Sequence, residues 1–286
     1  MRAKDIMSSP VVGIRPGDPI SHAKNMLIRY RVSRLLVISE GAPVGMLSLH
    51  DIAEGLNRGG PSWRRREIDQ IPVSSLMHRG VISASPNTGL DKIAQMMMKH
   101  GISSVVIAED NRPLGMITKT DVVRHFAEEL SGKLKVAALM TPDPVVVNRK
   151  HSISRILEMM EKWKIKRVIV VDGEKPIGMI SERDIAFAQL EIPWMGPRVS
   201  SVRYTRKLER GGRPKARYIK KIALLTAEEI MTPDPVTVDI YDDVATAAKL
   251  MLENGISGLP VLMNGRLKGI ITKTDIVRGV ARLGMR

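Results

Sequence analysis

The chain has 286 residues, of which 43% are hydrophobic and 3% aromatic, and it carries a formal net charge of +15 with a pI near 10.2. It contains no cysteine, which excludes disulfides, thiolate nucleophiles and cysteine metal sites. No apolar run approaches the length of a membrane span and no signal segment opens the chain, so we expect a cytoplasmic protein.

One pattern occurs four times along the chain. Each copy closes with Gly, two apolar residues, Ser or Thr, two variable residues and Asp, at 45–51, 115–121, 178–184 and 269–275. A methionine stands 44 residues before each of these Asp residues, at Met7, Met77, Met140 and Met231. A constant spacing of this kind indicates one supersecondary unit used four times.

The elements of the unit follow from its hydrophobic periodicity. Taken along the chain, helices with an apolar stripe are predicted to begin at Ile20, Leu90, Ile153 and Val244. Buried strands are predicted at 35–38, 105–108, 168–171 and 259–262. The predicted order is β-α-β-β-α, which is an α/β (α+β) fold.

The third copy shows the pattern most clearly. Residues 140–144 have the Pro and Asp residues of a turn, and 145–147 form a short strand. Ser152 is the predicted N-cap of a helix with Ile153, Ile156, Leu157 and Met160 on one face. A further strand is predicted at 177–180, and a second helix begins at Asp184.

The spacing also sets the domain organisation. We expect repeat one at 1–57, a basic connector at 58–71, repeat two at 72–130, repeat three at 135–190, a basic linker or hairpin insertion at 191–224, and repeat four at 225–284. A unit of about 55 residues is marginal by itself. The repeats are therefore expected to pair, the first with the second and the third with the fourth, with a cleft inside each pair.

These features resemble the CBS domain family, which is named for cystathionine beta-synthase. One Gly-apolar-apolar-Ser/Thr-x-x-Asp motif would be weak support, whereas four in register, each after a matched helix and strand, are specific. The resemblance covers nearly the whole chain except 191–224. Four such domains in one chain resemble archaeal adenosine-ligand sensors and the regulatory gamma subunit of AMP-activated protein kinase. The resemblance implies two pseudo-two-fold CBS pairs.

The resemblance also implies a ribose-binding role for the closing motif. A carboxylate can accept hydrogen bonds from both ribose hydroxyls, and the inherited positions are Asp51, Asp121, Asp184 and Asp275. The hydroxyl three residues earlier can donate to ribose or phosphate, at Ser48, Thr118, Ser181 and Thr272. The same arrangement also caps helices, and a cap and a ligand contact can share one helix N-terminus. Both interpretations stay open.

A second position distinguishes the four copies. Seventeen residues before each Asp stand Arg34, Ser104, Arg167 and Gly258. The resemblance implies a phosphate-binding cation here, and arginine suits phosphate because its planar fork donates bidentately. The predicted phosphate-binding residues are Arg34, Lys166 and Arg167, and the alternative for Arg34 is a solvated charge at a strand edge. The adenine base is expected in an apolar slot that includes Val145 and Val168.

No feature of the sequence indicates catalysis. The six histidines have no metal-ligand spacing, and the chain has neither a P-loop nor a nucleophile with its base. We therefore expect no enzyme activity, no metal site and no catalytic cofactor.

The connector before repeat four is strongly basic. Residues 198–221 contain ten Lys or Arg and one acid. Such a stretch is either a solvated linker or a docking surface for RNA, DNA or an acidic protein. The predicted contacts are Arg203, Arg206, Lys207, Arg213 and Arg217.

Two functions stay open on this basis. The first is a regulatory sensor that binds an adenosyl ligand, with AMP, ADP or ATP ahead of S-adenosylmethionine, in the clefts between paired repeats. Such a sensor would act on a partner enzyme or transporter in trans. The second is a nucleic-acid-binding protein in which 198–221 carries the function and the repeats are scaffold. The sequence names neither the partner nor the oligomeric state, and a homodimer stays open.

Overall fold

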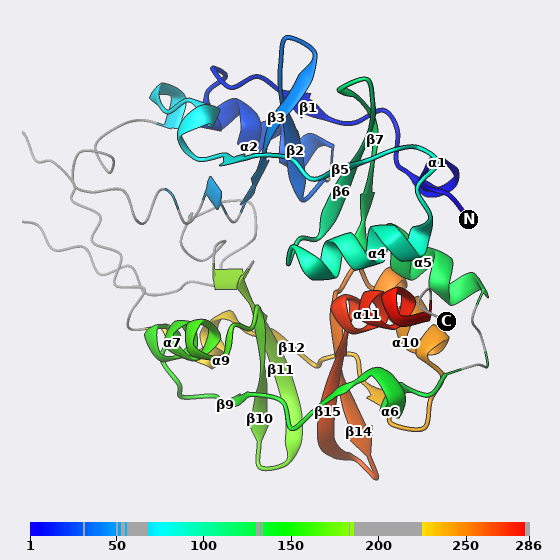
Figure 1. Ribbon diagram of the computed structural model, residues 1–286. Coiled ribbons are helices and arrows are strands. Elements are labelled where there is room, and N and C mark those ends of the chain that lie inside the picture. The colour runs from blue at the N-terminus through cyan, green and yellow to red at the C-terminus, as the bar shows by residue number, and fades with distance from the viewer. Residues whose placement is uncertain are drawn as a thin grey trace, which may run out of the picture. The chain divides into compact units, whose positions relative to one another are not determined.

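The computed structural model describes residues 1–30, 32–49, 51–52, 55, 68–129, 132, 134–182, 184–185 and 225–283. The chain divides into two compact units, whose elements are labelled in Figure 1. Unit 1 comprises 1–144 and 236–286 and therefore holds repeats one and two, the first residues of repeat three and most of repeat four. Unit 2 comprises 145–235 and holds the rest of repeat three and the first residues of repeat four.

Each repeat contains the predicted helix followed by a hairpin of two strands. Repeat one has β1 (Gly13–Ile14), α2 (Ile20–Arg29), β2 (Arg34–Ser39) and β3 (Ala42–Ser48). Repeat two has β5 (Ser83–Ala84), α4 (Leu90–Lys99), β6 (Ser104–Glu109), β7 (Arg112–Thr118) and α5 (Lys119–Glu129). Repeat three has β9 (Val146–Asn148), α7 (Ile153–Trp163), β10 (Arg167–Asp172) and β11 (Lys175–Ser181). Repeat four has β13 (Val238–Asp239), α10 (Val244–Glu253), β14 (Gly258–Met263), β15 (Arg266–Thr272) and α11 (Lys273–Leu283).

The predicted helices and buried strands are confirmed, and each buried strand extends one residue beyond both predicted ends. In every repeat the first short strand lies parallel to the second, which forms an antiparallel hairpin with the third. The hairpin register shifts at the same position in all four copies. The common bulge shows that one local design is repeated.

The start of helix α7 follows the sequence prediction. The Oγ of Ser152 accepts a hydrogen bond from the N–H of Arg155 at 3.3 Å, and so satisfies a donor that the helix leaves free. Ile153, Ile156 and Met160 are buried. Leu157, which was predicted on the same face, is instead 39% exposed, because it lies at the edge of that stripe.

The entry segment of each repeat, which holds or directly follows the methionine of the constant spacing, pairs with the sheet of a different repeat. β4 (His78–Arg79), in the entry segment of repeat two, pairs with β3 of repeat one, while Ser8 of repeat one bridges to Met116 in β7 of repeat two. β8 (Thr141–Pro142) pairs with β15 of repeat four, and β12 (Thr232–Pro233) pairs with β11 of repeat three. The prediction of a simple turn over 140–144 was therefore wrong at its second and third residues, whose backbone extends a neighbouring sheet.

Short helical turns lead into these exchanged segments. They are α1 (Ala3–Ile6), the 3-10 turns η2 (Ile68–Gln70) and η3 (Val73–Ser75), α6 (Val136–Leu139) and α9 (Ala227–Ile230). Their apolar residues Ala3, Val73, Val136 and Ala227 are fully buried. Burial of these residues therefore anchors each segment at a point that precedes its strand along the chain.

The exchange explains two repeated features of the sequence together. The methionine of each segment packs over the glycine of a closing motif, and the partners are Met77 with Gly45, Met7 with Gly115, Met231 with Gly178, and Met140 with Gly269. A Cβ at Gly115 would lie 2.5 Å from the sulfur of Met7, and one at Gly178 would lie 2.5 Å from that of Met231. A side chain at these glycines would displace the methionine.

Repeats one and two pack with equivalent faces together. Their shared apolar cluster contains Leu36 and Val106, which occupy the same position in the two repeats, together with Met116. The partly buried members are Val11 with its equivalent Val81, Ile38 with its equivalent Ala108, and Met46, the equivalent of Met116. Contact between equivalent residues is the mark of a pseudo-two-fold axis. The expected pairing of these two repeats is thus seen.

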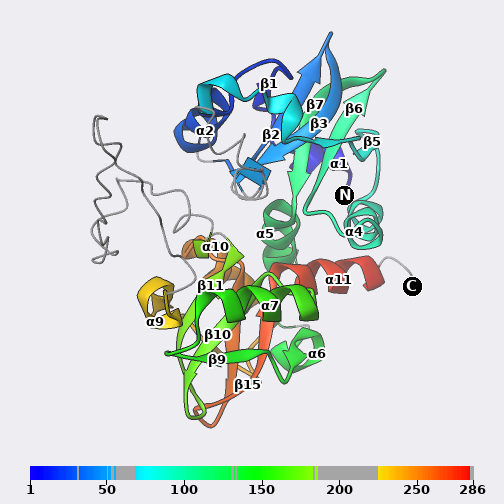
Figure 2. The ribbon, with the colours of Figure 1, turned by 90° about the vertical axis from the view of Figure 1, so that its left-hand side faces the viewer.

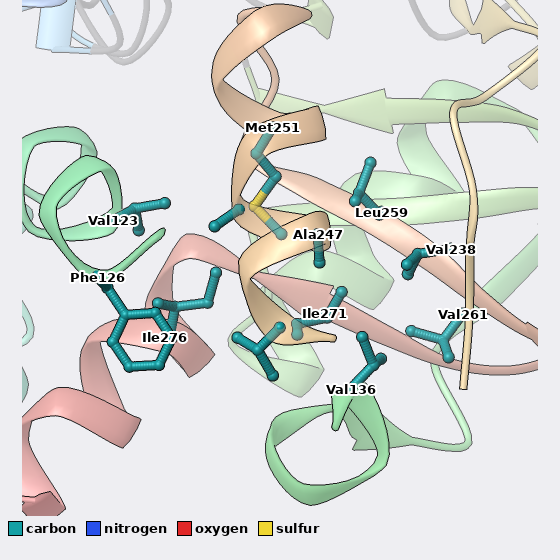
Figure 3. Packing of buried hydrophobic residues seen from close by; sticks show 12 residues of the cluster. Val123, Phe126, Val136, Val238, Ala247, Met251, Leu259, Val261, Ile271 and Ile276 are labelled. Carbon is teal, nitrogen blue, oxygen red and sulfur yellow. The ribbon is translucent and has the colours of Figure 1, made fainter. Parts of the chain in front are cut away.

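Repeats two and four pack through their helices instead. α5 lies against α10 and α11 lies against α4, as the views in Figures 1 and 2 agree. Val123 and Phe126 of α5 insert into the core of repeat four, while Val277 and Ala281 of α11 enter the core of repeat two. Figure 3 shows Phe126 beside Ile276 in this core.

Two reciprocal hydrogen bonds join the first turn of α5 to the first turn of α11. Nζ of Lys119 donates to Oγ1 of Thr274 at 2.9 Å, and Nζ of Lys273 donates to Oγ1 of Thr120 at 3.1 Å. The contacts exchange equivalent residues, so they define a second pseudo-two-fold relation inside unit 1.

Unit 2 has its own core and a charged clasp. Ile156, Val168 and Ile180 are fully buried there. At the surface, Arg149 contacts Asp172 at 3.0 Å and Glu228 at 3.1 Å, and these hydrogen bonds raise its pKa. The clasp ties the segment before repeat four to the sheet of repeat three. Among the described helices of both units, none is at once long and apolar enough to cross a membrane.

Candidate functional site

The closing motif forms the same hydrogen-bonded cap in all four repeats. Oδ2 of the Asp accepts the backbone N–H of the Ser or Thr three residues earlier, at 2.6 to 2.8 Å, and also its hydroxyl, at 2.6 to 2.7 Å. In repeats one, three and four the Asp N–H also points back to that hydroxyl, at 3.3 to 3.4 Å. The capping interpretation is therefore confirmed, and only one carboxylate oxygen is used for it.

The second position that distinguishes the repeats lies directly beside the cap. In the hairpin register, Arg34 is opposite Ser48, and Ser104 is opposite Thr118. The same register places Arg167 opposite Ser181 and Gly258 opposite Thr272. Residues seventeen and three positions before the Asp are therefore cross-strand neighbours, so a cation at the first can share a ligand with the hydroxyl at the second.

Arg34 joins repeats one and two at their pseudo-two-fold axis. Its Nη1 donates to Oγ of Ser104, the equivalent residue of repeat two, at 2.9 Å. Its Nε is buried and has no hydrogen-bond partner among the described residues. Burial lowers the pKa of Arg34, and attraction to Asp51 partly offsets this effect. Arg34 is therefore partly buried, with its Nε out of contact with solvent, and its predicted contact with phosphate stays a prediction.

Asp51 completes a cluster of polar groups around this arginine. Its side chain is 9% exposed, and its Oδ1 lies 2.9 Å from Nε2 of His78. His78 belongs to β4, the segment that precedes repeat two. The cluster is formed by three stretches of the chain: the β2–β3 hairpin with the cap that follows it, β4, and the start of β6. Its groups are the guanidinium of Arg34, the carboxylate of Asp51, the imidazole of His78 and the hydroxyls of Ser48 and Ser104.

The equivalent carboxylates of repeats two and four have different surroundings. Asp121 is 8% exposed, and its Oδ1 accepts a hydrogen bond from Nη1 of Arg124 at 3.0 Å. Asp275 is 3% exposed, and its Oδ1 contacts Nη1 of Arg278 at 3.0 Å and Oγ1 of Thr141 at 3.3 Å. Each carboxylate is therefore paired with an arginine on its own helix.

In unit 2 the predicted residues gather around the cap of repeat three. Asp184 is capped with Ser181, and Nζ of the exposed Lys166 lies 3.5 Å from Oε2 of Glu182. Arg167 begins β10 beside Ser181. Val168 is fully buried in the core and Val145 packs at its edge. Their predicted contact with an adenine base stays a prediction.

Several predictions fall outside the described residues. The basic contacts Arg203, Arg206, Lys207, Arg213 and Arg217 all belong to 186–224, which the structure does not describe. Within the described ranges, no group of three or more His, Cys, Asp or Glu side chains is placed to hold a metal ion.

Sequence reasoning missed the second partners of the carboxylates. Arg124 and Arg278 could have been found, because each stands three residues after its Asp, where a helix brings the two side chains together. His78 could not, since it follows Asp51 by 27 residues and its approach depends on the exchanged segment. A hollow lies at the opposite end of the β2–β3 hairpin from Arg34 and Ser48, and none of the residues of the Asp51 cluster lines it. Its lining includes Gly13, Arg15, Asp18, Ile38 and Glu40.

The fold and the repeated caps define a tandem-repeat protein of one domain type. A model of the CBS domain matches residues 3–58, 73–128, 136–191 and 227–282. These four matches cover most of the chain, so the protein belongs to the CBS domain family.

Its relatives include two uncharacterized proteins of Methanocaldococcus jannaschii. MJ1404 is 25% identical over 285 residues, which are 98% of this chain but only 62% of the relative. MJ1225 is 24% identical over 287 residues, with 96% of this chain and 97% of the relative covered. The chain thus spans less than two thirds of one relative and nearly all of the other.

Two solved structures share the fold over the whole chain. The crystal structure of MJ1225, described as a proposed archaeal homologue of g-AMPK, matches with a TM-score of 0.78 at 22% identity and covers 98% of this chain and 99% of that one. An uncharacterized conserved protein from Pyrococcus horikoshii matches with a TM-score of 0.65 at 20% identity and covers 98% and 100%. At these identities the likeness concerns the fold alone.

Proposed function

We propose that the protein is a regulatory sensor that binds a phosphorylated adenosyl ligand at the junction of repeats one and two. The observation that carries the proposal is Arg34, a cation with a buried and unpaired Nε, beside the capping carboxylate of Asp51. A buried charge with an unmet donor is costly unless another group satisfies it. A phosphate that accepts from both Nε and an Nη of this guanidinium would do so.

The neighbouring groups fit the rest of such a ligand. Oδ1 of Asp51 takes no part in the helix cap and contacts only His78 among the described residues, so it is a suitable acceptor for a ribose hydroxyl if His78 moves. The half-buried apolar side chains Val11 and Val81 of the shared cluster supply the kind of surface on which a flat base packs. AMP, ADP or ATP combine a phosphate, a ribose and a base, and we rank them above S-adenosylmethionine, which lacks phosphate.

Repeat three carries the same combination in unit 2. Arg167 stands beside Ser181 and Asp184, as Arg34 stands beside Ser48 and Asp51. We propose a second phosphate-binding site of the same type there. Repeats two and four have Ser104 and Gly258 at this position, so a phosphate at either would need a cation from elsewhere.

A regulatory role follows from the chemistry that the proposed site offers. It combines donors and acceptors that could hold a nucleotide, which is what a regulatory binding site needs. The description of MJ1225 as a proposed homologue of g-AMPK agrees with regulation. The regulated partner would be an enzyme or transporter in trans, and a homodimer is compatible with the proposal.

The test is calorimetric titration of the full chain with AMP, ADP, ATP, adenosine and S-adenosylmethionine at matched ionic strength. AMP, ADP or ATP is expected to bind more tightly than adenosine. Arg34→Gln should remove that phosphate-dependent difference at the site of repeats one and two, leave the proposed site of repeat three unchanged, and leave adenosine binding within about twofold. Arg112→Gln, at an exposed position in β7, is the matched control and should leave all affinities unchanged. If none of the five ligands binds the wild-type protein, the proposal is wrong.

A further inference from the structure

The four capping carboxylates use one oxygen alike and differ in what holds the other. Oδ2 of each is committed to the helix cap. In unit 1 the groups that hold Oδ1 of Asp51, Asp121 and Asp275 are, in that order, His78, Arg124, and Arg278 together with Thr141. A ribose that binds such a carboxylate through both hydroxyls needs this second oxygen, so its partner decides how easily the ribose can bind.

The arginine partners hold their carboxylates locally. Arg124 and Arg278 each lie three residues after their Asp on the same helix, at 3.0 Å. An arginine remains charged at any physiological pH. Each arginine pair is therefore made within a single helical turn, so it can persist when another contact to the carboxylate changes, such as that of Thr141 with Asp275.

The histidine partner is held in a different way. His78 comes from another segment of the chain, 27 residues away, and its side chain is 74% exposed. An exposed side chain loses little packing when it changes rotamer, and a contact that water can replace contributes little to stability. Asp51 would not be left alone after release, because it still attracts Arg34.

We propose that His78 is a placeholder that occupies the ribose position at Asp51 in the ligand-free protein and rotates away when an adenosyl ligand binds. This inference rests on the proposed function and names the residue that sets affinity at its site. Within unit 1 it also assigns different roles to the equivalent Asp residues of the repeated motif. Asp51 exchanges a protein partner for a ribose, whereas Asp121 and Asp275 act as helix caps with their second oxygen retained by arginine.

If His78 is a placeholder, its removal should change the AMP affinity in the opposite direction from the removal of a residue that contacts the ligand. Removal of a competing exposed pair should tighten AMP binding by roughly two- to fivefold, the range that such a pair is worth. Removal of a side chain that touches the ligand, or that only supports the fold, should weaken binding or leave it unchanged. The sign of the change therefore separates these roles.

The experiment is titration of full-length wild type, His78→Ala and Arg79→Ala with AMP. His78→Ala should bind AMP two- to fivefold more tightly, and Arg79→Ala, the exposed neighbour on β4, should match the wild type. In parallel, the ring proton signals of His78 in the wild type are followed by NMR during AMP titration, and they should shift with the same Kd as the calorimetric one.

The outcomes separate the two ideas. If AMP binds the wild type and needs Arg34, but His78→Ala binds with equal or lower affinity, or the ring signals of His78 do not move, the placeholder role is wrong and the proposed function stands. If AMP binds neither the wild type nor His78→Ala, the proposed function is wrong and the placeholder role falls with it.

Discussion

Replacement of Arg34 by methionine should preserve or raise the stability of the ligand-free protein while it removes phosphate recognition. The guanidinium makes one described hydrogen bond, to the neutral hydroxyl of Ser104 at 2.9 Å, and its Nε is buried without a partner. A buried unsatisfied donor costs about 1–3 kcal/mol, whereas the hydrogen bond that is lost contributes about 0.5–3 kcal/mol. Methionine fills irregular apolar space well. The difference between these two contributions runs from a loss of about 2 to a gain of about 2.5 kcal/mol. The apolar packing of methionine favours the upper half of that range, from roughly zero to a gain of about 2 kcal/mol.

The assay is urea unfolding of wild type and Arg34→Met, without ligand and with AMP at a hundredfold excess over the wild-type Kd. Such an excess at the site of repeats one and two stabilises the wild type by about 2.7 kcal/mol. The gain from this site should vanish in the variant, whereas a gain from the proposed site of repeat three should remain. Arg112→Met, in the exposed hairpin, should change stability by no more than about 0.5 kcal/mol. The reasoning is refuted if Arg34→Met loses more than 1 kcal/mol without ligand and keeps the full stabilisation by AMP.

Three further predictions test the fold and the alternative function. Phe126→Ala should cost about 3–5 kcal/mol in urea unfolding, because this ring is 2% exposed in the core shared by repeats two and four. Tyr241→Ala, at a 67% exposed site, should cost less than about 0.5 kcal/mol. In thermal unfolding, Gly115→Val should lower stability by about 1–3 kcal/mol, because its side chain clashes with Met7. Gly17→Ala, whose Cβ would meet no atom within 4 Å, is the control and should be tolerated. If the basic connector binds single-stranded RNA, anisotropy titrations should show a salt dependence that flattens by roughly 0.7 per lost phosphate contact when four cations are neutralised, and no salt-dependent binding in the wild type would exclude this function. The four are Arg203, Arg206, Lys207 and Arg213.

The internal fold of each repeat could be predicted because its signals are local. A stripe such as Ile153, Ile156 and Met160 needs only its own helix to define a buried face. The strands and the cap at Ser152 follow in the same way from neighbouring residues. Each of these patterns is complete within a few turns of chain, so a single sequence contains all the information that is needed.

The exchange of the entry segments could not be predicted, although the sequence carries its trace. The spacing of 44 residues from Met7 to Asp51 suggests one continuous unit, yet Met7 packs on Gly115 in repeat two. Four equivalent methionines and four equivalent glycines offer several combinations with the same apolar contacts. The choice depends on how the repeats pair in space, and periodicity along the chain does not contain that information.

The candidate site was predictable in its parts and not in its assembly. Asp51 and Arg34 could be singled out because both stand at fixed positions of the unit, and the hairpin register brings Arg34 opposite Ser48 of the cap. Their predicted contacts with ribose and phosphate stay predictions. The contact from Arg34 to Ser104 depends on a pseudo-two-fold axis, and the contact from His78 depends on the exchanged strand β4. Both require tertiary structure before they can be seen.

Repetition of a motif does not by itself give repetition of a site. In all four repeats the hydroxyl and the carboxylate satisfy each other, so the cap alone creates no demand for a ligand. Within the described part of unit 1, the demand arises at repeat one, where Arg34 keeps an unmet buried donor and Asp51 is held by an exposed histidine. A polar arrangement left incomplete in this way persists when something outside the chain completes it. We therefore expect fewer bound nucleotides than motifs, and the incomplete groups rather than the repeated ones identify where they bind.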